Sequence, residues 1–435
     1  MLLVVLFLSA SANQQFMFEN IPKTHRVQKG LSQDTDSKVQ ILDAKGWSGE
    51  VVINENTGSS TFFWMWQKLG SSIENDTVPL MIFLTGGPGC SGENENLGQF
   101  GPIEIDLDLN PIKRNTTWSD LVHILFIDYP LDAGYSFAAS SQDLVNTTSQ
   151  ATVHLYKFLS IITKKYPVWF RREVYIFGYS YAGHYIPDIA YKLLFDNHEN
   201  LPIKLTKVAI GDPWVDPLSQ ADAYSEFSYA ASLIDEHQRS EISQMEQNSK
   251  SQISVGNYLS ANSIDSMIQE RLDRYSGGVN LMNIRMYRDY NPGIHAKWLE
   301  LNSTKALLHV PQHVEWVYCS DKVSHDFRED IMMSYRDYLE KVLEKVPVMI
   351  YGGQDDLLVS NVGVDAMIHS MSWYGQKYFQ KAQRGVWKVQ NSVAGYYKKA
   401  GNLVRVWVNK AGHLVPYDQP ENAYDMVKRF INEEW

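Results

Sequence analysis

An apolar run leads directly into a serine at residues 173–183, EVYIFGYSYAG. The run Glu173 to Phe177 is rich in residues that favour strands, and Ala182 to Asp196 has the apolar spacing of a helix. A serine between such elements lies on a tight turn that needs small flanking residues, here Gly178 and Ala182. The strict motif has glycine in place of Ala182. The string alone is weak evidence for a nucleophile, and the strand–turn–helix context strengthens it.

Short strand patterns alternate with longer helical patterns along the chain. Strands are expected at Glu50 to Ile53, Ser60 to Gln67, Pro79 to Leu84, Leu121 to Ile127, Glu173 to Phe177, Lys204 to Ile210, Val346 to Ile350 and Leu403 to Val408. Helices are expected at Ser149 to Lys164, Ala182 to Asp196, Asp330 to Leu343 and Glu421 to Glu434. Several strands are almost wholly apolar, which is typical of strands buried on both faces. The pattern predicts an α/β fold with a mostly parallel central sheet flanked by helices.

The chain divides into a core and an insertion. Residues 216–320 are polar, lean towards helix and contain no convincing core strand, which predicts a helical cap inserted between core segments 13–215 and 321–435. Residues 1–12 hold an apolar stretch and alanines at the spacing of a signal-peptide cleavage site. A signal peptide is therefore expected there, and a buried first strand is the alternative.

Composition excludes several classes of function. The 435 residues include 39 Lys and Arg against 50 Asp and Glu, for a net charge of −11, which disfavours nucleic-acid binding. No apolar run is long enough for a membrane span. With two cysteines and no metal-binding histidine pair beside a glutamate, we expect neither a metal nor another cofactor.

Several features indicate an oxidising compartment. The glycosylation sequons start at Asn75, Asn115, Asn146 and Asn302, all in polar, loop-like surroundings. Cys90 and Cys319 either form one disulfide or stay as two buried thiols. With the predicted signal peptide, these features favour the secretory pathway, with the lysosome or vacuole or the extracellular space as destination.

A base and an acid suited to activating Ser180 occur later in the chain. His413 follows the last predicted strand, and Asp356 follows the strand Val346 to Ile350. Serine needs a base to accept its proton, and the base needs an acid to fix its tautomer. The order Ser, Asp, His is that of α/β-hydrolases. Asp355 is the competing acid, and a surface-loop role is the alternative for His413.

A glycine-rich run at residues 84–90, LTGGPGC, ends another predicted strand. Glycine lets a backbone N–H approach a developing oxyanion that a Cβ atom would block. The absence of a following Gly-Lys-Ser/Thr disfavours a phosphate-binding loop.

Five separated motifs together resemble the serine carboxypeptidase family, with an α/β-hydrolase fold. They are Gly86 to Ser91, Phe126 to Pro130 with Gly134 to Phe137, Ser180 to Pro187, Tyr351 to Asp356 and Gly412 to Pro416. From Tyr351 onward the chain is most similar to the vitellogenic-like branch. The resemblance implies Ser180 as nucleophile, His413 as base and Asp356 as orienting acid. It further implies an oxyanion hole from the N–H groups of Gly87 and Tyr181, and a Cys90–Cys319 disulfide.

The chain departs from the family pattern where a substrate's terminal carboxylate is expected to bind. Thr85 replaces Asn or Gln, and Gln99 and Tyr179 each replace Glu; Gly86 adjoins Thr85. Neither Gln99 nor Tyr179 becomes an anion near neutral pH. If these residues still bind the carboxylate, the KM for peptides should change little between acid and neutral pH.

The motifs predict a serine-type carboxypeptidase that hydrolyses C-terminal residues of peptides or proteins through an acyl-enzyme. An esterase or acyltransferase on the same scaffold is one alternative, favoured by the altered carboxylate site. A non-catalytic binding protein is the other, and the complete triad argues against it.

Overall fold

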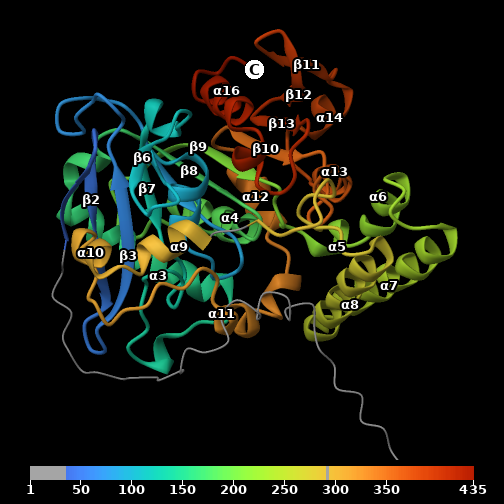
Figure 1. Ribbon diagram of the computed structural model, residues 1–435. Helices are drawn as coiled ribbons and strands as arrows, with labels where there is room; N and C mark the ends of the chain where they lie inside the picture. Colours follow the sequence, from blue (N-terminus) through green and yellow to red (C-terminus); the bar gives the residue numbers. More distant parts are fainter. Residues whose placement is uncertain (1–35, 291–292) are drawn as a thin grey trace, which may run out of the picture.

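The computed structural model describes residues 36–290 and 293–435 (Figure 1). The predicted signal peptide at residues 1–12 lies outside the described residues. In the described part of the chain, eleven strands form one sheet in the order β1-β2-β3-β7-β4-β8-β9-β10-β13-β12-β11. The strands are β1 (Asp36–Ile41), β2 (Ala44–Asn54), β3 (Ser59–Trp66), β4 (Leu80–Leu84), β7 (His123–Ile127), β8 (Glu173–Tyr179), β9 (Lys204–Gly211), β10 (Val348–Gly353), β11 (Gly385–Val389), β12 (Ser392–Ala400) and β13 (Leu403–Val408).

The middle of the sheet is parallel and its edges are antiparallel. Strands β7, β4, β8, β9, β10 and β13 run parallel to one another. The antiparallel strands β1 to β3 flank them on one side, and β12 and β11 on the other. The fold class expected from the sequence agrees with this arrangement. Every predicted strand is present.

The sequence analysis missed strands at the two ends of the main sheet and a separate two-stranded hairpin. They are β1, β11 and β12, together with the short separate hairpin of β5 (Ile103–Ile105) and β6 (Pro111–Lys113). In β11 only Trp387 is buried, and most of β12 is partly or fully exposed. Edge strands bury little apolar surface, so their sequences lack the apolar runs that identify the central strands.

Helices cover both faces of the sheet. Leu155 in α3 (Thr148–Lys165), Ile189 in α4 (Ala182–Phe195) and Leu339 in α12 (Arg336–Leu343) pack in one core with Ile82 of β4. Phe430 in α16 (Pro420–Ile431) packs on the opposite face with Phe83. Adjacent residues of β4 point to opposite faces, so both must be apolar.

The predicted helix Asp330 to Leu343 is wrong as a single element. It consists of a 3₁₀ turn, η5 (Asp330–Met332), followed after a break by α12. The backbone N–H of Tyr335 donates to the carbonyl of Val215 at 2.9 Å, and its hydroxyl donates to Asp330 at 2.8 Å. These contacts with another segment and with η5 replace the helical hydrogen bonds that the periodicity suggested.

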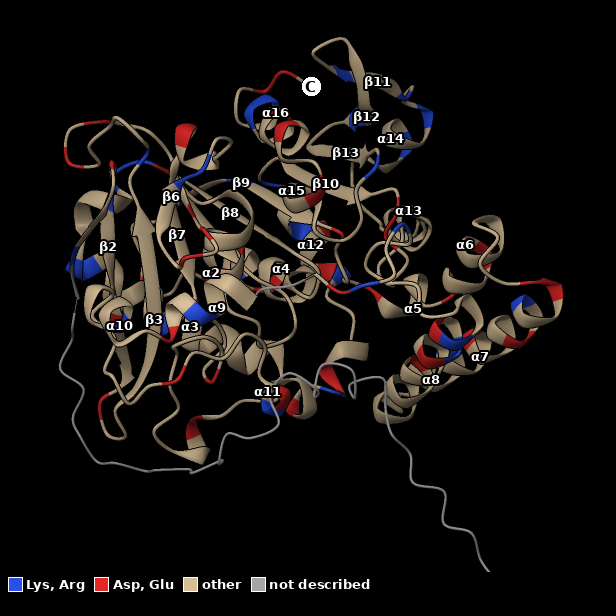
Figure 2. Cartoon of the chain, viewed as in Figure 1, with Lys and Arg blue, Asp and Glu red and all other residues tan. Residues whose placement is uncertain are grey.

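The insertion at residues 216–320 separates into two parts. Helices α6 (Tyr224–Ala230), α7 (Glu236–Ser254) and α8 (Tyr258–Ser276) extend from the sheet around a small core of their own (Figure 1). Basic and acidic residues both occur along α7 and α8, as the blue and red segments of the ribbon show (Figure 2). Helices α9 (Gly293–Leu299) and α10 (Asn302–Leu307) instead lie beside β3, where Trp298 stacks on Trp64 with ring centroids 6.4 Å apart. The described residues of the insertion form no strand, and its exact boundaries stay a prediction.

No helix in the described ranges has the length and apolarity required to cross a bilayer.

Candidate active site

Ser180 lies on the turn between β8 and α4. Its φ is 61°, a left-handed conformation that is unusual for a residue with a side chain. The turn is held by its neighbours: the Ser180 N–H donates to the carbonyl of Gly211 at 2.8 Å, and its carbonyl accepts from Gly183 at 2.9 Å. Its side chain is half-buried. Such a strained turn presents the hydroxyl at the end of the parallel strands, as a nucleophile requires.

His413 and Asp356 form a buried pair at the same edge of the sheet. Nδ1 of His413 lies 2.7 Å from Oδ2 of Asp356, and both side chains are at most 2% exposed. Asp356 follows β10, and His413 lies between β13 and α15 (Val415–Asp418). The rings of His413 and Tyr179 are 5.6 Å apart, which places the imidazole beside the residue that precedes Ser180.

The competing acid, Asp355, points elsewhere. Its carboxylate lies 3.5 Å from the guanidinium of Arg285 and is 20% exposed. Asp356, in contrast, accepts a second hydrogen bond from the backbone of Val359 at 3.1 Å. The two adjacent aspartates therefore have different environments, and Asp356 is the one that can orient His413.

Backbone carbonyls of the insertion accept hydrogen bonds from the loops that carry Asp356 and His413. The carbonyl of Met282 accepts the N–H of His413 at 2.7 Å, and the carbonyl of Leu281 accepts the N–H groups of Leu357 and Leu358 at 3.0 and 2.8 Å. Sequence reasoning missed this support, because backbone carbonyls leave no residue pattern to detect.

A second buried acid, Asp212, adjoins the pair. It follows β9, and its carboxylate oxygens, those of Asp356 and the nitrogens of His413 supply ligand atoms within 4.8 Å of one another. Oδ1 of Asp212 accepts the N–H of Gly353 at 2.9 Å. Burial, followed by the nearby charge of Asp356, raises the pKa of Asp212 well above its usual range. Burial and the neighbouring carboxylate of Asp356 therefore both disfavour an ionised Asp212.

Among the described residues, Asp212, Asp356 and His413 are the one group of side chains that could together coordinate a metal ion. Nδ1 of His413 and Oδ2 of Asp356 are already hydrogen-bonded to each other. That donor set suits proton transfer better than binding of a cation.

The glycine loop after β4 packs directly on the serine turn. A Cβ atom on Gly86 would lie 2.7 Å from the Cβ of Ser180 and 2.8 Å from the nitrogen of Tyr181, so only glycine fits. Gly87, which has a φ of 116°, is exposed. Within the described chain, the N–H groups of Gly87 and Tyr181 donate to no other group. Two unused donors beside the serine are what a developing oxyanion requires.

The comparison with protein families settles which group of proteins this arrangement belongs to. A family model described as serine carboxypeptidase matches residues 37–433. The chain belongs to the serine carboxypeptidase family. Members of this family hydrolyse peptide bonds, so the chain is an enzyme of that class.

Individual relatives agree with the family match. The chain is 31% identical over 386 residues to "Serine carboxypeptidase-like 50" of Arabidopsis thaliana, covering 88% of this chain and 87% of the relative. It is 28% identical over 419 residues to "Probable serine carboxypeptidase CPVL" of Homo sapiens, covering 93% and 87%. A similar solved structure is KEX1, a prohormone-processing carboxypeptidase of Saccharomyces cerevisiae, with a TM-score of 0.81 and 24% identity over 91% of this chain and 95% of that one. This likeness confirms the α/β-hydrolase fold.

The disulfide implied by the family resemblance is present. Cys90 and Cys319 are bonded, although 229 residues separate them in sequence. Backbone hydrogen bonds flank the bridge, from Ser91 to the carbonyl of Tyr318 at 2.8 Å and from Ser320 to that of Gly89 at 2.9 Å. The bridge therefore fastens the glycine loop of this serine carboxypeptidase to the end of the insertion.

The positions that depart from the family pattern meet at a residue that the sequence analysis missed. The carboxylate of Glu95, the last residue of α2 (Glu93–Glu95), accepts hydrogen bonds from Thr85 at 2.6 Å, Tyr179 at 2.8 Å and Gln99 at 3.3 Å. Burial raises the pKa of Glu95 to about 7. Glu95 was overlooked because it lies in a polar run, residues 93–96, with no motif. The site therefore contains an ionisable carboxyl group that the residues at positions 85, 99 and 179 do not reveal.

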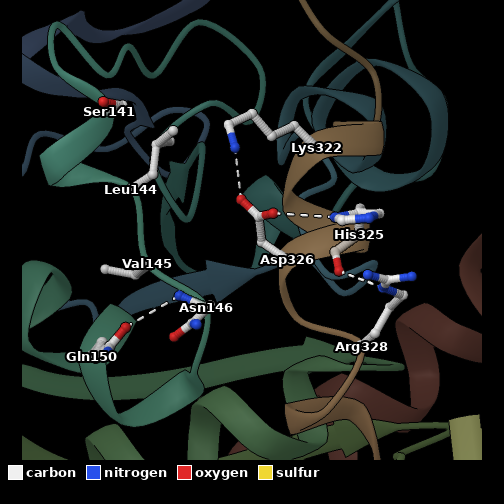
Figure 3. Close-up of a pocket in the computed structure, with 9 residues that line it drawn as sticks. All are labelled: Ser141, Leu144, Val145, Asn146, Gln150, Lys322, His325, Asp326 and Arg328. Carbon is white, nitrogen blue, oxygen red and sulfur yellow. Dashed lines mark hydrogen bonds and ion pairs between the residues drawn. The ribbon is translucent and has the colours of Figure 1, made fainter. Parts of the chain in front are cut away.

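The predicted glycosylation sites are accessible. Asn75, Asn115, Asn146 and Asn302 are all exposed, and Asn302 begins α10. Asn146 also borders a surface hollow of about 530 Å³ next to α11 (Asp321–Asp326), shown in Figure 3. Lys322, His325 and Arg328 line it, and the candidate catalytic residues do not.

Proposed function

We propose that this chain removes C-terminal residues from peptides or proteins through an acyl-enzyme on Ser180. His413 accepts the proton of the Ser180 hydroxyl through Nε2 while Asp356 holds Nδ1. The new bond joins Oγ of Ser180 to the scissile carbonyl carbon, and the N–H groups of Gly87 and Tyr181 bind the resulting oxyanion. His413 then passes the proton to the leaving amine, and the C–N bond breaks.

Water completes the cycle by the same steps. His413 takes a proton from the water, the hydroxide attacks the acyl carbon, and the proton returns to Ser180 as the ester bond breaks. The observation that carries the proposal is the 2.7 Å contact between His413 and Asp356, with the His413 ring packed on Tyr179 next to Ser180.

A time course on blocked dipeptides at about pH 4 and 7 tests this function. We expect release of the C-terminal residue by the wild type and none by Ser180→Ala. A fluorophosphonate should label the wild type and not the variant. Release by the variant at the wild-type rate would contradict the assigned nucleophile.

An esterase or acyltransferase is the second candidate, and one observation favours it. Thr85, Gln99 and Tyr179 direct hydrogen bonds to Glu95 instead of leaving them open for a substrate carboxylate. Parallel assays on a blocked dipeptide and on its activated ester separate the two: this candidate predicts ester cleavage without C-terminal trimming.

We further propose that the protein acts in the secretory pathway, in the lysosome or vacuole or outside the cell. The disulfide supports an oxidising compartment, and the exposed sequons can accept glycans. Mass spectrometry of protein from eukaryotic cells, before and after removal of N-glycans, tests the assignment.

A further inference from the structure

A buried carboxylate lies behind the serine turn, at the start of η5. Oδ2 of Asp330 accepts hydrogen bonds from the hydroxyls of Tyr181 and Thr148, the second at 2.6 Å. Oδ1 accepts from the hydroxyl of Tyr335 at 2.8 Å. Nδ1 of His184 lies 3.6 Å from Oδ2, and neither side chain is exposed to solvent. The acid is thus joined to Tyr181, whose backbone N–H we propose to bind the oxyanion.

Asp330 keeps its negative charge in this buried position. Burial alone would raise its pKa, but the contacts with His184, Thr148 and Tyr181 outweigh burial and hold the pKa below its usual value. Burial lowers the pKa of His184, so the groups around the carboxylate are neutral near pH 7. A neutral acceptor could join the same hydroxyls at a lower cost of desolvation. What the charge adds is strength, because hydrogen bonds to a carboxylate are shorter and stronger than those to a neutral group.

The same turn also reaches the peptide group between Ser180 and Tyr181 from its other side. The backbone N–H of Trp214 donates to the carbonyl of Ser180 at 3.1 Å. Its indole N–H donates to the carbonyl of Ile331 in η5 at 2.7 Å. The Ser180 carbonyl and the Tyr181 N–H belong to one planar unit and point in opposite directions. Contacts that fix the carbonyl on one side and the Tyr181 side chain on the other therefore fix the direction of the N–H.

We propose that Asp330 is a positioning residue for the oxyanion hole: it orients the N–H of Tyr181 by holding the Tyr181 hydroxyl, while Trp214 fixes the other side of the same peptide group. A misdirected N–H stabilises an oxyanion poorly, because a hydrogen bond weakens steeply as its angle departs from linear. The oxyanion forms only as the reaction proceeds, so the effect falls on kcat and not on substrate binding. The inference rests on the proposed function, because the oxyanion hole belongs to that site.

Two variants remove the same hydrogen bond from its two ends. Asp330→Asn keeps the size of the side chain and removes its charge, and Tyr181→Phe removes the hydroxyl and keeps the ring and the backbone N–H. On a blocked dipeptide, each should lower kcat by about 10- to 100-fold while KM stays within about twofold. The double variant should lose no more than the larger single loss, because both changes remove one interaction.

The rate at which a fluorophosphonate labels Ser180 gives a second readout. The phosphoryl oxygen of the reagent enters the same oxyanion hole, so the second-order rate constant should fall by about the factor seen for kcat. Tyr335→Phe is the internal control, since it removes a donor from the other oxygen of Asp330 and leaves the bond to Tyr181 in place. Its kcat should stay within about threefold of wild type.

A second buried aspartate serves as a matched control for general damage. Asp143 accepts hydroxyl hydrogen bonds from Thr57 and Ser59, both at 2.5 Å, and so holds the turn between β2 and β3 instead of the serine turn. Asp143→Asn should lower the thermal midpoint and leave kcat and the labelling rate unchanged. Loss of a buried charged contact without a change in catalysis is what a purely structural role predicts.

The outcomes separate this inference from the proposed function. A loss of kcat in Asp330→Asn no larger than in Asp143→Asn, or multiplied losses in the double variant, overturns the role of Asp330 and leaves the carboxypeptidase intact. So does a rise in KM at unchanged kcat. If Asp330→Asn fails to fold, Tyr181→Phe decides alone, and an unchanged kcat in that variant overturns the role. A wild type that neither cleaves the dipeptide nor is labelled at Ser180 overturns the proposed function and this inference with it.

Discussion

Asp212 and Asp356 form a pair of buried carboxyl groups behind His413. Both are at most 1% exposed, and Asp212 is hydrogen-bonded to the backbone of Gly353 through Oδ1. Oxygens of the two carboxyl groups lie within 4.8 Å of each other. Two carboxylates this close in a site without water resist ionising together. Asp356 faces the imidazole of His413, whereas burial and then the charge of Asp356 raise the pKa of Asp212 well above its usual range, which favours the neutral form of Asp212.

This pairing predicts that Asp212 positions Asp356 through a donated hydrogen bond. Asp212→Asn retains a donor, so its kcat should stay within a few-fold of wild type, whereas Asp212→Leu should lower kcat by about 10- to 100-fold. The split between kcat and KM distinguishes positioning from general damage: loss of the donor should lower kcat while KM changes little, because positioning acts on the reacting groups and not on substrate binding. Equal losses of kcat in Asp212→Asn and Asp212→Leu would contradict the proposed role of Asp212.

Asp356 and Asp355 should respond very differently to the same change. Asp356→Asn removes the charge that fixes the His413 tautomer and should lower kcat by about 10⁴-fold. Asp355→Asn disturbs a partly exposed contact with Arg285 and should change kcat less than about threefold. Steady-state kinetics on one blocked dipeptide compares them. A larger loss in Asp355→Asn would mean that the orienting acid is misassigned.

The disulfide should stabilise the fold and the oxyanion loop together. The bridge closes a loop with a sequence separation of 229, and in the chain-entropy view a loop of that length favours folding by roughly 5–6 kcal/mol. Replacing both cysteines by serine should therefore lower the thermal midpoint and reduce kcat more than KM. Calorimetry and kinetics on the double variant measure both effects. An unchanged midpoint would show that backbone hydrogen bonds alone secure this junction.

Glu246 should make stability depend on pH. Burial raises its folded pKa to about 7, above the unfolded value, so the unfolded state ionises first as pH rises. The free energy of unfolding therefore loses a contribution between about pH 4 and 7 and levels off above that range. Relative to wild type, Glu246→Gln should gain roughly 1–3 kcal/mol over this interval. Denaturant unfolding of wild type and variant at about pH 4 and 7 measures the sign of this difference in stability. A variant that becomes less stable relative to wild type as the pH rises would contradict the prediction.

Local sequence patterns were enough to locate the central elements. The apolar runs of β4 and β7 predict strands buried on both faces, since each face must pack against a helical layer. The Gly178–Ala182 turn predicts the position of Ser180 because few backbones allow such a sharp reversal. The apolar periodicity of residues 330–343 predicted one helix, and that prediction was wrong. The helix is interrupted before α12, where the N–H of Tyr335 donates to the carbonyl of Val215 in another segment.

What the sequence by itself determined is therefore the order of the central strands along the chain, the serine turn and a short set of candidate partners. The family resemblance already pointed to Asp356 as the orienting acid, and the tertiary structure shows that Asp356 contacts His413 while Asp355 contacts Arg285. Only the tertiary structure revealed that Glu95 and Asp212 lie at the site. Apolar periodicity indicates which residues are buried, because the residues that face the core recur at the spacing of a helix or a strand. Which buried groups come into contact depends on the order in the sheet of strands that are far apart in sequence. The ionisation of each buried group depends on the same contacts, because burial and nearby charges shift its pKa.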